Sequence, residues 1–78
     1  MVPKPIWYTD HARRRMRERG ITRQQVRFLI ARGDRPLAAD DPLVWESRAY
    51  LGRREASVIF VQSAERYLVI TVQWVDEA

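Results

Sequence analysis

The order of the secondary-structure signals constrains this chain most strongly, because every clear helix signal precedes every clear strand signal. Helical patterns with capping residues occupy residues 9–33, and runs rich in β-branched and aromatic residues occupy residues 44–75. A parallel βαβ unit needs strands and helices in alternation, and no glycine-rich phosphate loop is present. The sequence therefore predicts an α+β domain in which two N-terminal helices pack on a three- to four-stranded antiparallel sheet.

Capping residues set the boundaries of the two predicted helices. Thr9 is the expected N-cap of a first helix that runs through residues 11–19, and Gly20 is expected at the left-handed position that ends it. Thr22 begins a capping box for a second helix, which ends at Gly33. The short link between the two helices predicts a tight helical hairpin.

The remaining segments are expected to be extended. Residues 1–8 are predicted to form an extended N-terminal arm, because two prolines there lack amide donors. A short edge strand is predicted at Leu37–Ala39. The three main strands are predicted at Val44–Leu51, Ser57–Gln62 and Tyr67–Val75.

Alternation along the predicted strands places polar residues on shared faces. Arg48 is expected to share a face with Tyr50, and Tyr67 is expected to share one with Thr71 and Gln73. Either set is a candidate to line a cleft. The last two strands are apolar at most positions, which predicts at least partial cover on both faces of the sheet.

Length and composition exclude several classes of protein. The 78 residues are enough for a single domain, residues 1–78. With no Cys and one His, the chain has no disulfide framework or thiolate zinc site, so no metal or other cofactor is expected. No apolar run approaches the roughly 20 residues that span a bilayer. The N-terminal segment lacks a secretory signal, so a cytoplasmic location is expected.

The formal net charge of +4 conceals a strong asymmetry, with +7 on residues 1–35 and −3 on residues 36–78. Thirteen of the 14 basic residues are Arg, whose planar guanidinium suits phosphate and stacks on bases. Two interpretations stay open: a solvated helix in an arginine-rich chain, or a surface for nucleic acid or an acidic partner. On the second interpretation, the residues expected to contact nucleic acid are Arg13, Arg14, Arg17, Arg23, Arg27, Arg48 and Gln73.

The only histidine, His11, begins a stripe along the first helix that continues at i+4 and i+8 with Arg15 and Arg19. A neutral imidazole beside two guanidiniums suits phosphodiester cleavage, because the imidazole moves a proton while the arginines hold the phosphate. Thr71 or Gln73 is expected to orient that phosphate. The alternative is an ordinary helix surface on which the arginines are solvated or paired with Glu18.

Residues 9–22 (TDHARRRMRERGIT) resemble the signature Ser/Thr-x-His-Ala-x-x-Arg-Met-x-x-Arg-Gly-Ile-Ser/Thr of the domain of unknown function 4258 family. Residues 69–72 (VITV) resemble the closing Ile-Ile-Thr-Val strand of that family. The resemblance covers nearly the whole chain, from Thr9 to Asp76. The chain departs from the family pattern at Gln73 and Val75, where the family often has Tyr and Pro.

This family is similar to the RelE and BrnT types of small bacterial toxins. The likeness implies a RelE-like fold, RNA as the substrate, and an acidic antitoxin or inhibitor as protein partner. Carried over residue by residue, it points to His11, Arg15 and Arg19 as the site. The leading hypothesis is a metal-independent endoribonuclease toxin. Its rivals are a non-catalytic module that binds nucleic acid or an acidic protein through the arginine-rich helix, and a pure protein-interaction domain.

Overall fold

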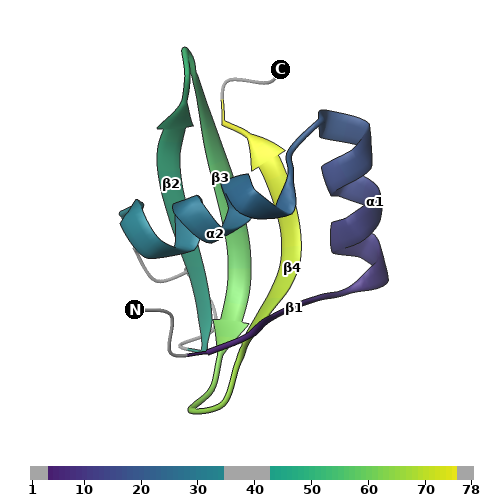
Figure 1. Cartoon of the computed structure of the whole chain (residues 1–78), viewed down its shortest axis with the longest axis vertical. Coiled ribbons are helices and arrows are strands. Elements are labelled where there is room, and N and C mark those ends of the chain that lie inside the picture. Colours follow the sequence, from purple (N-terminus) through teal and green to yellow (C-terminus); the bar gives the residue numbers. More distant parts are fainter. Residues whose placement is uncertain (1–3, 35–42, 76–78) are drawn as a thin grey trace.

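The computed structural model describes residues 4–34 and 43–75, and these form an α+β unit with a single sheet (Figure 1). The fold class predicted from the sequence is confirmed at this level. The predicted edge strand at Leu37–Ala39 lies outside the described residues. The elements follow in the order β1 (Ile6–Tyr8), α1 (Asp10–Arg19), α2 (Arg23–Arg32), β2 (Val44–Leu51), β3 (Arg54–Gln62) and β4 (Tyr67–Trp74).

The sheet is mixed, which corrects the predicted antiparallel arrangement. Its strand order is β1-β4-β3-β2, and β1 runs parallel to β4 while the other two pairs are antiparallel. The Tyr67 amide donates to the Pro5 carbonyl at 3.0 Å, and the Thr9 amide donates to the Val69 carbonyl at 3.1 Å. The arm thus supplies a partner for the outer edge of β4. The sequence does not predict this pairing, because three residues are too few to show an alternating pattern. The strand forms because the unpaired edge of β4 offers it backbone hydrogen bonds.

Capping contacts confirm both predicted helix starts. The Thr9 hydroxyl accepts a hydrogen bond from the Ala12 amide at 3.0 Å. Thr22 and Gln25 form a complete capping box, in which each side chain accepts from the backbone amide of the other. Gly20 has a φ of 69°, the left-handed conformation expected where α1 ends.

The two helices do not form the predicted tight hairpin. α1 continues from β1 along β4, whereas α2 runs in a different direction across β2 and β3 (Figure 1). α1 buries Ala12 and Met16, and α2 buries Val26, Leu29 and Ile30. Each helix has only a narrow apolar stripe, so each turns that stripe to the sheet and little remains for contact with the other helix.

The residue that follows α2, Gly33, occupies a confined space. Its backbone is extended, with a φ of −80° and a ψ of 165°, and not left-handed. A Cβ atom at this position would lie 2.7 Å from both the Arg48 and the Leu29 carbonyl oxygens. Next to it, the backbones of Asp34 and Arg48 exchange two hydrogen bonds of 3.1 Å. This close approach ties the end of α2 to β2 beside Arg48.

A register irregularity in β4 decides which of its residues face the helices. β4 carries one extra residue, Ile70, relative to β3. As a result Tyr67 lies on the helix side, with its ring centroid 5.7 Å from that of Phe60, while Thr71 and Gln73 lie on the opposite side. The prediction that Tyr67 shares a face with these two residues is wrong, because the bulge interrupts the alternation.

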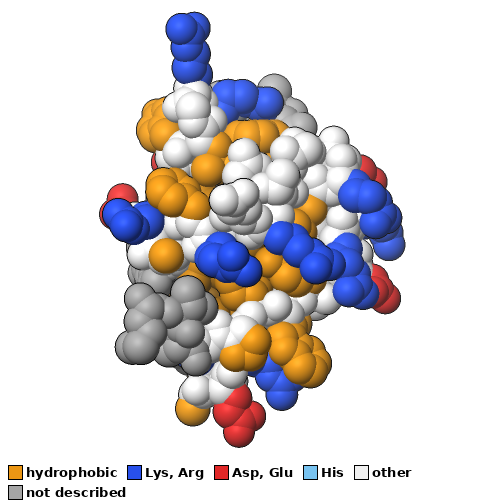
Figure 2. All heavy atoms as spheres, viewed as in Figure 1, with side chains coloured by type: hydrophobic (Ala, Val, Ile, Leu, Met, Phe, Trp, Pro, Cys, Tyr) orange, Lys and Arg blue, Asp and Glu red, His pale blue; other side chains and the backbone are white. Residues whose placement is uncertain are grey.

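The core lies between the helices and one face of the sheet, and no described helix covers the other face. The burial agrees with the predicted partial cover of both faces, because on this second face Ser57 is fully buried and Ile59 and Thr71 are half-buried. On the helix side, basic side chains lie across hydrophobic surface (Figure 2). No helix in residues 4–34 and 43–75 is long and apolar enough to span a membrane. The residues called here the open sheet face are Glu46, Arg48, Tyr50, Ser57, Ile59, Thr71 and Gln73.

Candidate nucleic-acid interface

The predicted stripe on α1 is present, and its two arginines meet at one carboxylate. Arg15 Nη1 lies 3.0 Å from Glu18 Oε1, and Arg19 Nη1 lies 3.7 Å from the same oxygen. His11 is exposed in the first turn of α1, one turn before Arg15. The ion pairs with Glu18 match one feature of the alternative interpretation, in which the stripe is an ordinary helix surface.

A polar cluster occupies the open sheet face. Glu46 Oε2 accepts a hydrogen bond from Arg48 Nε at 2.9 Å and another from Ser57 Oγ at 2.6 Å. Ser57 is fully buried and the Glu46 side chain is 17% exposed, whereas the Arg48 side chain is 45% exposed. Arg48 uses Nε on Glu46, and no hydrogen bond engages its two terminal nitrogens within the described residues. The contact through Nε leaves the geometry of a bidentate contact between the two terminal nitrogens and an anion such as phosphate.

The charge state of the cluster follows from its contacts. Burial raises the pKa of Glu46, but the hydrogen bonds from Arg48 and Ser57 and the charge of Arg48 outweigh it, so this pKa lies below its ordinary value. The hydrogen bond and charge of Glu46 in turn raise the pKa of Arg48. Glu46 is therefore ionised at neutral pH and fixes the guanidinium. No group of three or more His, Asp or Glu side chains in the described parts of the chain is placed to hold a metal ion.

The sheet register brings two predicted binding residues into one row. Arg48 pairs with Ser57 on β3, and Ser57 pairs with Gln73 on β4, so Arg48 and Gln73 flank a buried serine. The adjacent row contains Glu46, Ile59 and Thr71. Thr71 lies on β4, whereas His11, Arg15 and Arg19 lie on α1. The predicted catalytic set is thus divided between α1 and β4.

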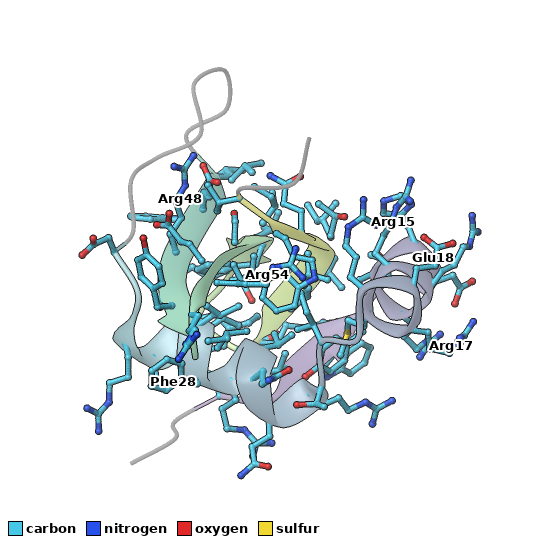
Figure 3. All side chains as sticks on the ribbon, turned by 90° about the horizontal axis from the view of Figure 1, so that it is seen from above. Arg15, Arg17, Glu18, Phe28, Arg48 and Arg54 are labelled. Carbon is cyan, nitrogen blue, oxygen red and sulfur yellow. The ribbon has the colours of Figure 1, made fainter. Side chains whose placement is uncertain are left out.

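Tyr50 and Arg15 lie at the margins of this face. Tyr50 follows Arg48 at i+2 on β2, as predicted, and is 65% exposed. Arg15 on α1 and Arg48 on β2 both lie on the side of the sheet away from α2 (Figure 3). The open sheet face therefore has one arginine on each side and an exposed aromatic ring beside one of them.

A second arginine-rich surface, called here the helix groove, lies where α1 meets the start of α2. Arg23 is held over the Tyr8 ring, with its guanidinium carbon 5.2 Å from the ring centroid, and Arg27 follows one turn later. Burial raises the pKa of the Tyr8 hydroxyl, and the charges of Arg23 and Arg27 oppose that rise. The groove is lined by Arg13, Met16, Arg17, Gly20, Ile21, Thr22 and Arg23.

The predicted nucleic-acid contacts therefore divide between two surfaces. Arg48 and Gln73 lie on the open sheet face. Most of the others belong to the helix groove or its rim, and Arg14 is exposed on α1. The seven predicted contact residues therefore do not form a single continuous interface.

Sequence reasoning missed Glu46 and Ser57. The signal for Glu46 was available, because it precedes Arg48 by two residues on a predicted strand and so shares its face. Ser57 gave no such signal, because its contact with Glu46 depends on the pairing of β2 with β3.

Comparison with known proteins places the chain in a family. A family model described as a domain of unknown function (DUF4258) matches residues 8–74. The chain belongs to this family. No curated protein and no solved structure matches the chain. The match to the 4258 family runs from the end of β1 to the end of β4, so the α1 stripe, the helix groove and the open sheet face all belong to the family domain.

Proposed function

We propose that this protein is a small, metal-independent endoribonuclease of the RelE-like toxin type, which seats RNA on the open sheet face. The observation that carries the proposal is the Glu46–Arg48–Ser57 cluster on a face that no described helix covers. The carboxylate fixes the guanidinium by its Nε, so the terminal nitrogens are oriented before a phosphate arrives. The exposed Tyr50 ring beside Arg48 offers a surface on which a base stacks.

The proposed chemistry divides the work between the sheet and α1. Arg48 binds the scissile phosphate and stabilises the charge that develops on it, with Glu46 as its positioning residue. Arg15 flanks the same face from α1, and Thr71 and Gln73 contribute polar contacts from β4. His11 is the proposed proton-transfer group, because imidazole exchanges protons near neutral pH. In RNA cleavage of this kind the ribose 2′-hydroxyl loses a proton and attacks the adjacent phosphorus, and the 5′ oxygen that leaves takes up a proton.

The test is cleavage of single-stranded RNA by the purified protein, with mapping of the new RNA ends. We expect His11→Ala to lower the rate by about 10²–10⁴, the usual contribution of a general acid or base. Arg48→Ala and Arg15→Ala are expected to weaken both RNA binding and cleavage. Arg32→Ala is the matched control, because Arg32 is exposed in the last turn of α2 on the other side of the sheet. Folded His11→Ala and Arg48→Ala variants that cleave at the wild-type rate would overturn the proposal.

Cellular function is tested by induced expression. A toxin is expected to arrest growth, and the His11→Ala variant is expected to relieve the arrest at equal protein level. Co-expression with an acidic antitoxin or inhibitor is expected to relieve it as well. Growth arrest that persists with His11→Ala would separate toxicity from the proposed chemistry.

A second candidate function is a module that binds nucleic acid without cutting it. The ion pairs of Arg15 and Arg19 with Glu18 favour it, because one carboxylate partly compensates the two guanidiniums and leaves less charge to offer a scissile phosphate. This candidate predicts strongly salt-dependent RNA binding, since phosphate contacts release counterions, and no cleavage products. The RNA-end mapping described above decides between the two.

A further inference from the structure

The helix groove combines an apolar floor with three arginines at its rim. Its floor contains Met16 and Ile21, which are 7% and 3% exposed. Its rim carries Arg13 and Arg17 from α1 and Arg23 from α2. A surface of this composition suits a ligand that brings both apolar and acidic groups.

The rim arginines are short of acidic partners. Arg13 pairs with Asp10, which is itself 91% exposed, whereas no described carboxylate forms an ion pair with Arg17 or Arg23. Arg13 and Arg17 are spaced i, i+4 on one helix face, and like charges at this spacing destabilise a helix. The fold thus keeps a repulsive arrangement that an external anion would relieve.

Two further contacts hold positive charge at the groove. The Tyr8 ring of β1 lies beneath the Arg23 guanidinium, an arrangement in which the ring face attracts the cation. The start of α2 lies at Thr22 and Arg23, so the positive end of the helix dipole adds to the charge of the side chains. Both contacts favour a position of the Arg23 guanidinium at the rim of the groove.

We propose that the helix groove binds an acidic amphipathic segment of a partner protein, with the apolar side chains of that segment on the Met16–Ile21 floor and its carboxylates on Arg13, Arg17 and Arg23. Charge complementarity selects an acidic occupant, and the apolar floor favours a peptide over an RNA backbone, which brings charge but no apolar side chain. The groove is lined by residues of α1, of α2 and of the link between them, whereas the open sheet face is formed by β2, β3 and β4, so this inference does not rest on the proposed endoribonuclease function.

The test uses the full chain and a fluorescent synthetic peptide built from Glu, Leu and Ala, with a matched peptide that has Gln in place of Glu. Fluorescence anisotropy is expected to show tighter binding of the Glu peptide. The Arg17→Glu/Arg23→Glu double variant is expected to lose about tenfold or more in affinity, as for two reversed ion pairs. Arg32→Glu/Arg53→Glu carries the same charge change outside the groove and is expected to change affinity by about twofold at most.

Three results would overturn the inference. The first is no preference of the wild-type protein for the Glu peptide. The second is an equal loss of affinity in the two double variants. The third is competition, in which single-stranded RNA binds the groove and displaces the peptide from it. That result would make the groove a nucleic-acid surface. Circular dichroism checks that the variants fold, and Arg17→Gln/Arg23→Gln serves as a milder pair if they do not.

A structural readout separates the inference from the proposed function. Amide signals of Gly20, Ile21 and Arg23 are expected to shift in NMR spectra when the Glu peptide binds, while those of Arg48 and Ser57 stay in place. Arg48→Ala is expected to weaken RNA binding and leave peptide binding unchanged. An absence of peptide binding would therefore reject the groove proposal without bearing on RNA cleavage. An absence of RNA cleavage would reject the proposed function without bearing on peptide binding.

Discussion

The open sheet face and the helix groove present arginine in opposite settings. On the open sheet face Arg48 is fixed by Glu46, which is fixed in turn by the buried Ser57. In the helix groove Arg17 and Arg23 have no ion-pair partner among the described carboxylates. The number of arginines in the sequence therefore does not show that they form two different kinds of surface. A fixed arginine suits a directed contact with one anion, and an uncompensated cluster suits association driven by charge.

The largest expected effect is on the core that both surfaces share. Phe60 is fully buried beneath the helices and contacts the Tyr67 ring, so Phe60→Ala is expected to cost about 3–5 kcal/mol of unfolding free energy. Urea denaturation measures this loss. Phe28→Ala is the control, because Phe28 is 45% exposed and its removal is expected to cost about 0.5 kcal/mol or less. Equal losses would contradict the assignment of Phe60 to the core.

Two glycines that follow the last residues of the helices, Gly20 after α1 and Gly33 after α2, give the next comparison. Gly33→Ala is expected to cost about 1–3 kcal/mol, because its Cβ meets backbone carbonyls of α2 and β2. Gly20→Ala is expected to cost about 1 kcal/mol, since nothing crowds the new Cβ and only the left-handed φ of 69° opposes it. Thermal denaturation ranks the two variants. A larger loss for Gly20→Ala would contradict the account of Gly33 as a position limited by space.

A smaller effect concerns pH and belongs to the open sheet face alone. The pKa of Glu46 is lower in the folded state than its ordinary value of 4.5, so its contribution to stability is present above that value. The contribution is lost as the pH falls below 4.5 through the folded-state pKa. The stability difference between the wild type and Glu46→Gln is therefore expected to shrink on acidification, measured by urea denaturation across this range. A difference that does not change with pH would remove the assigned role of the Glu46 carboxylate.

The smallest expected effect is on the salt dependence of RNA binding. Arg48→Ala removes one phosphate contact, so the slope of log affinity against log salt is expected to fall by about 0.7 for a single strand. Arg32→Ala is expected to leave the slope unchanged, because Arg32 lies on α2 away from the open sheet face. An unchanged slope in Arg48→Ala would mean that RNA does not use this arginine.

Local signals made the helices and most strands predictable. The Thr9 cap, the capping box at Thr22 and the left-handed Gly20 all depend on residues within one helical turn, and each is found where the sequence placed it. β2 begins and ends as predicted, and β4 differs only at its last residue. β3 begins three residues earlier than predicted, at Arg54, because its pairing with β2 extends it beyond its apolar run.

Contacts between distant segments could not be predicted in the same way. The parallel pairing of β1 with β4 joins residues about sixty positions apart. β1 has three residues, which are too few to show the alternation that predicts a strand. The extra Ile70 in β4 separates Tyr67 from Thr71 and Gln73, and nothing in the residue types marks the bulge. The same holds for the site, because the row that joins Arg48, Ser57 and Gln73 exists only through strand register.

The sequence by itself determined the α+β class, the helix boundaries, the concentration of arginine in the first half and the stripe from His11 to Arg19, because these follow from local spacing and capping. Only the tertiary structure decided that the sheet is mixed, that the arginines divide between two surfaces, and that Glu46 holds Arg48. The physical reason is that register, burial and ion pairing depend on which segments meet in space, and one-dimensional spacing does not contain that information.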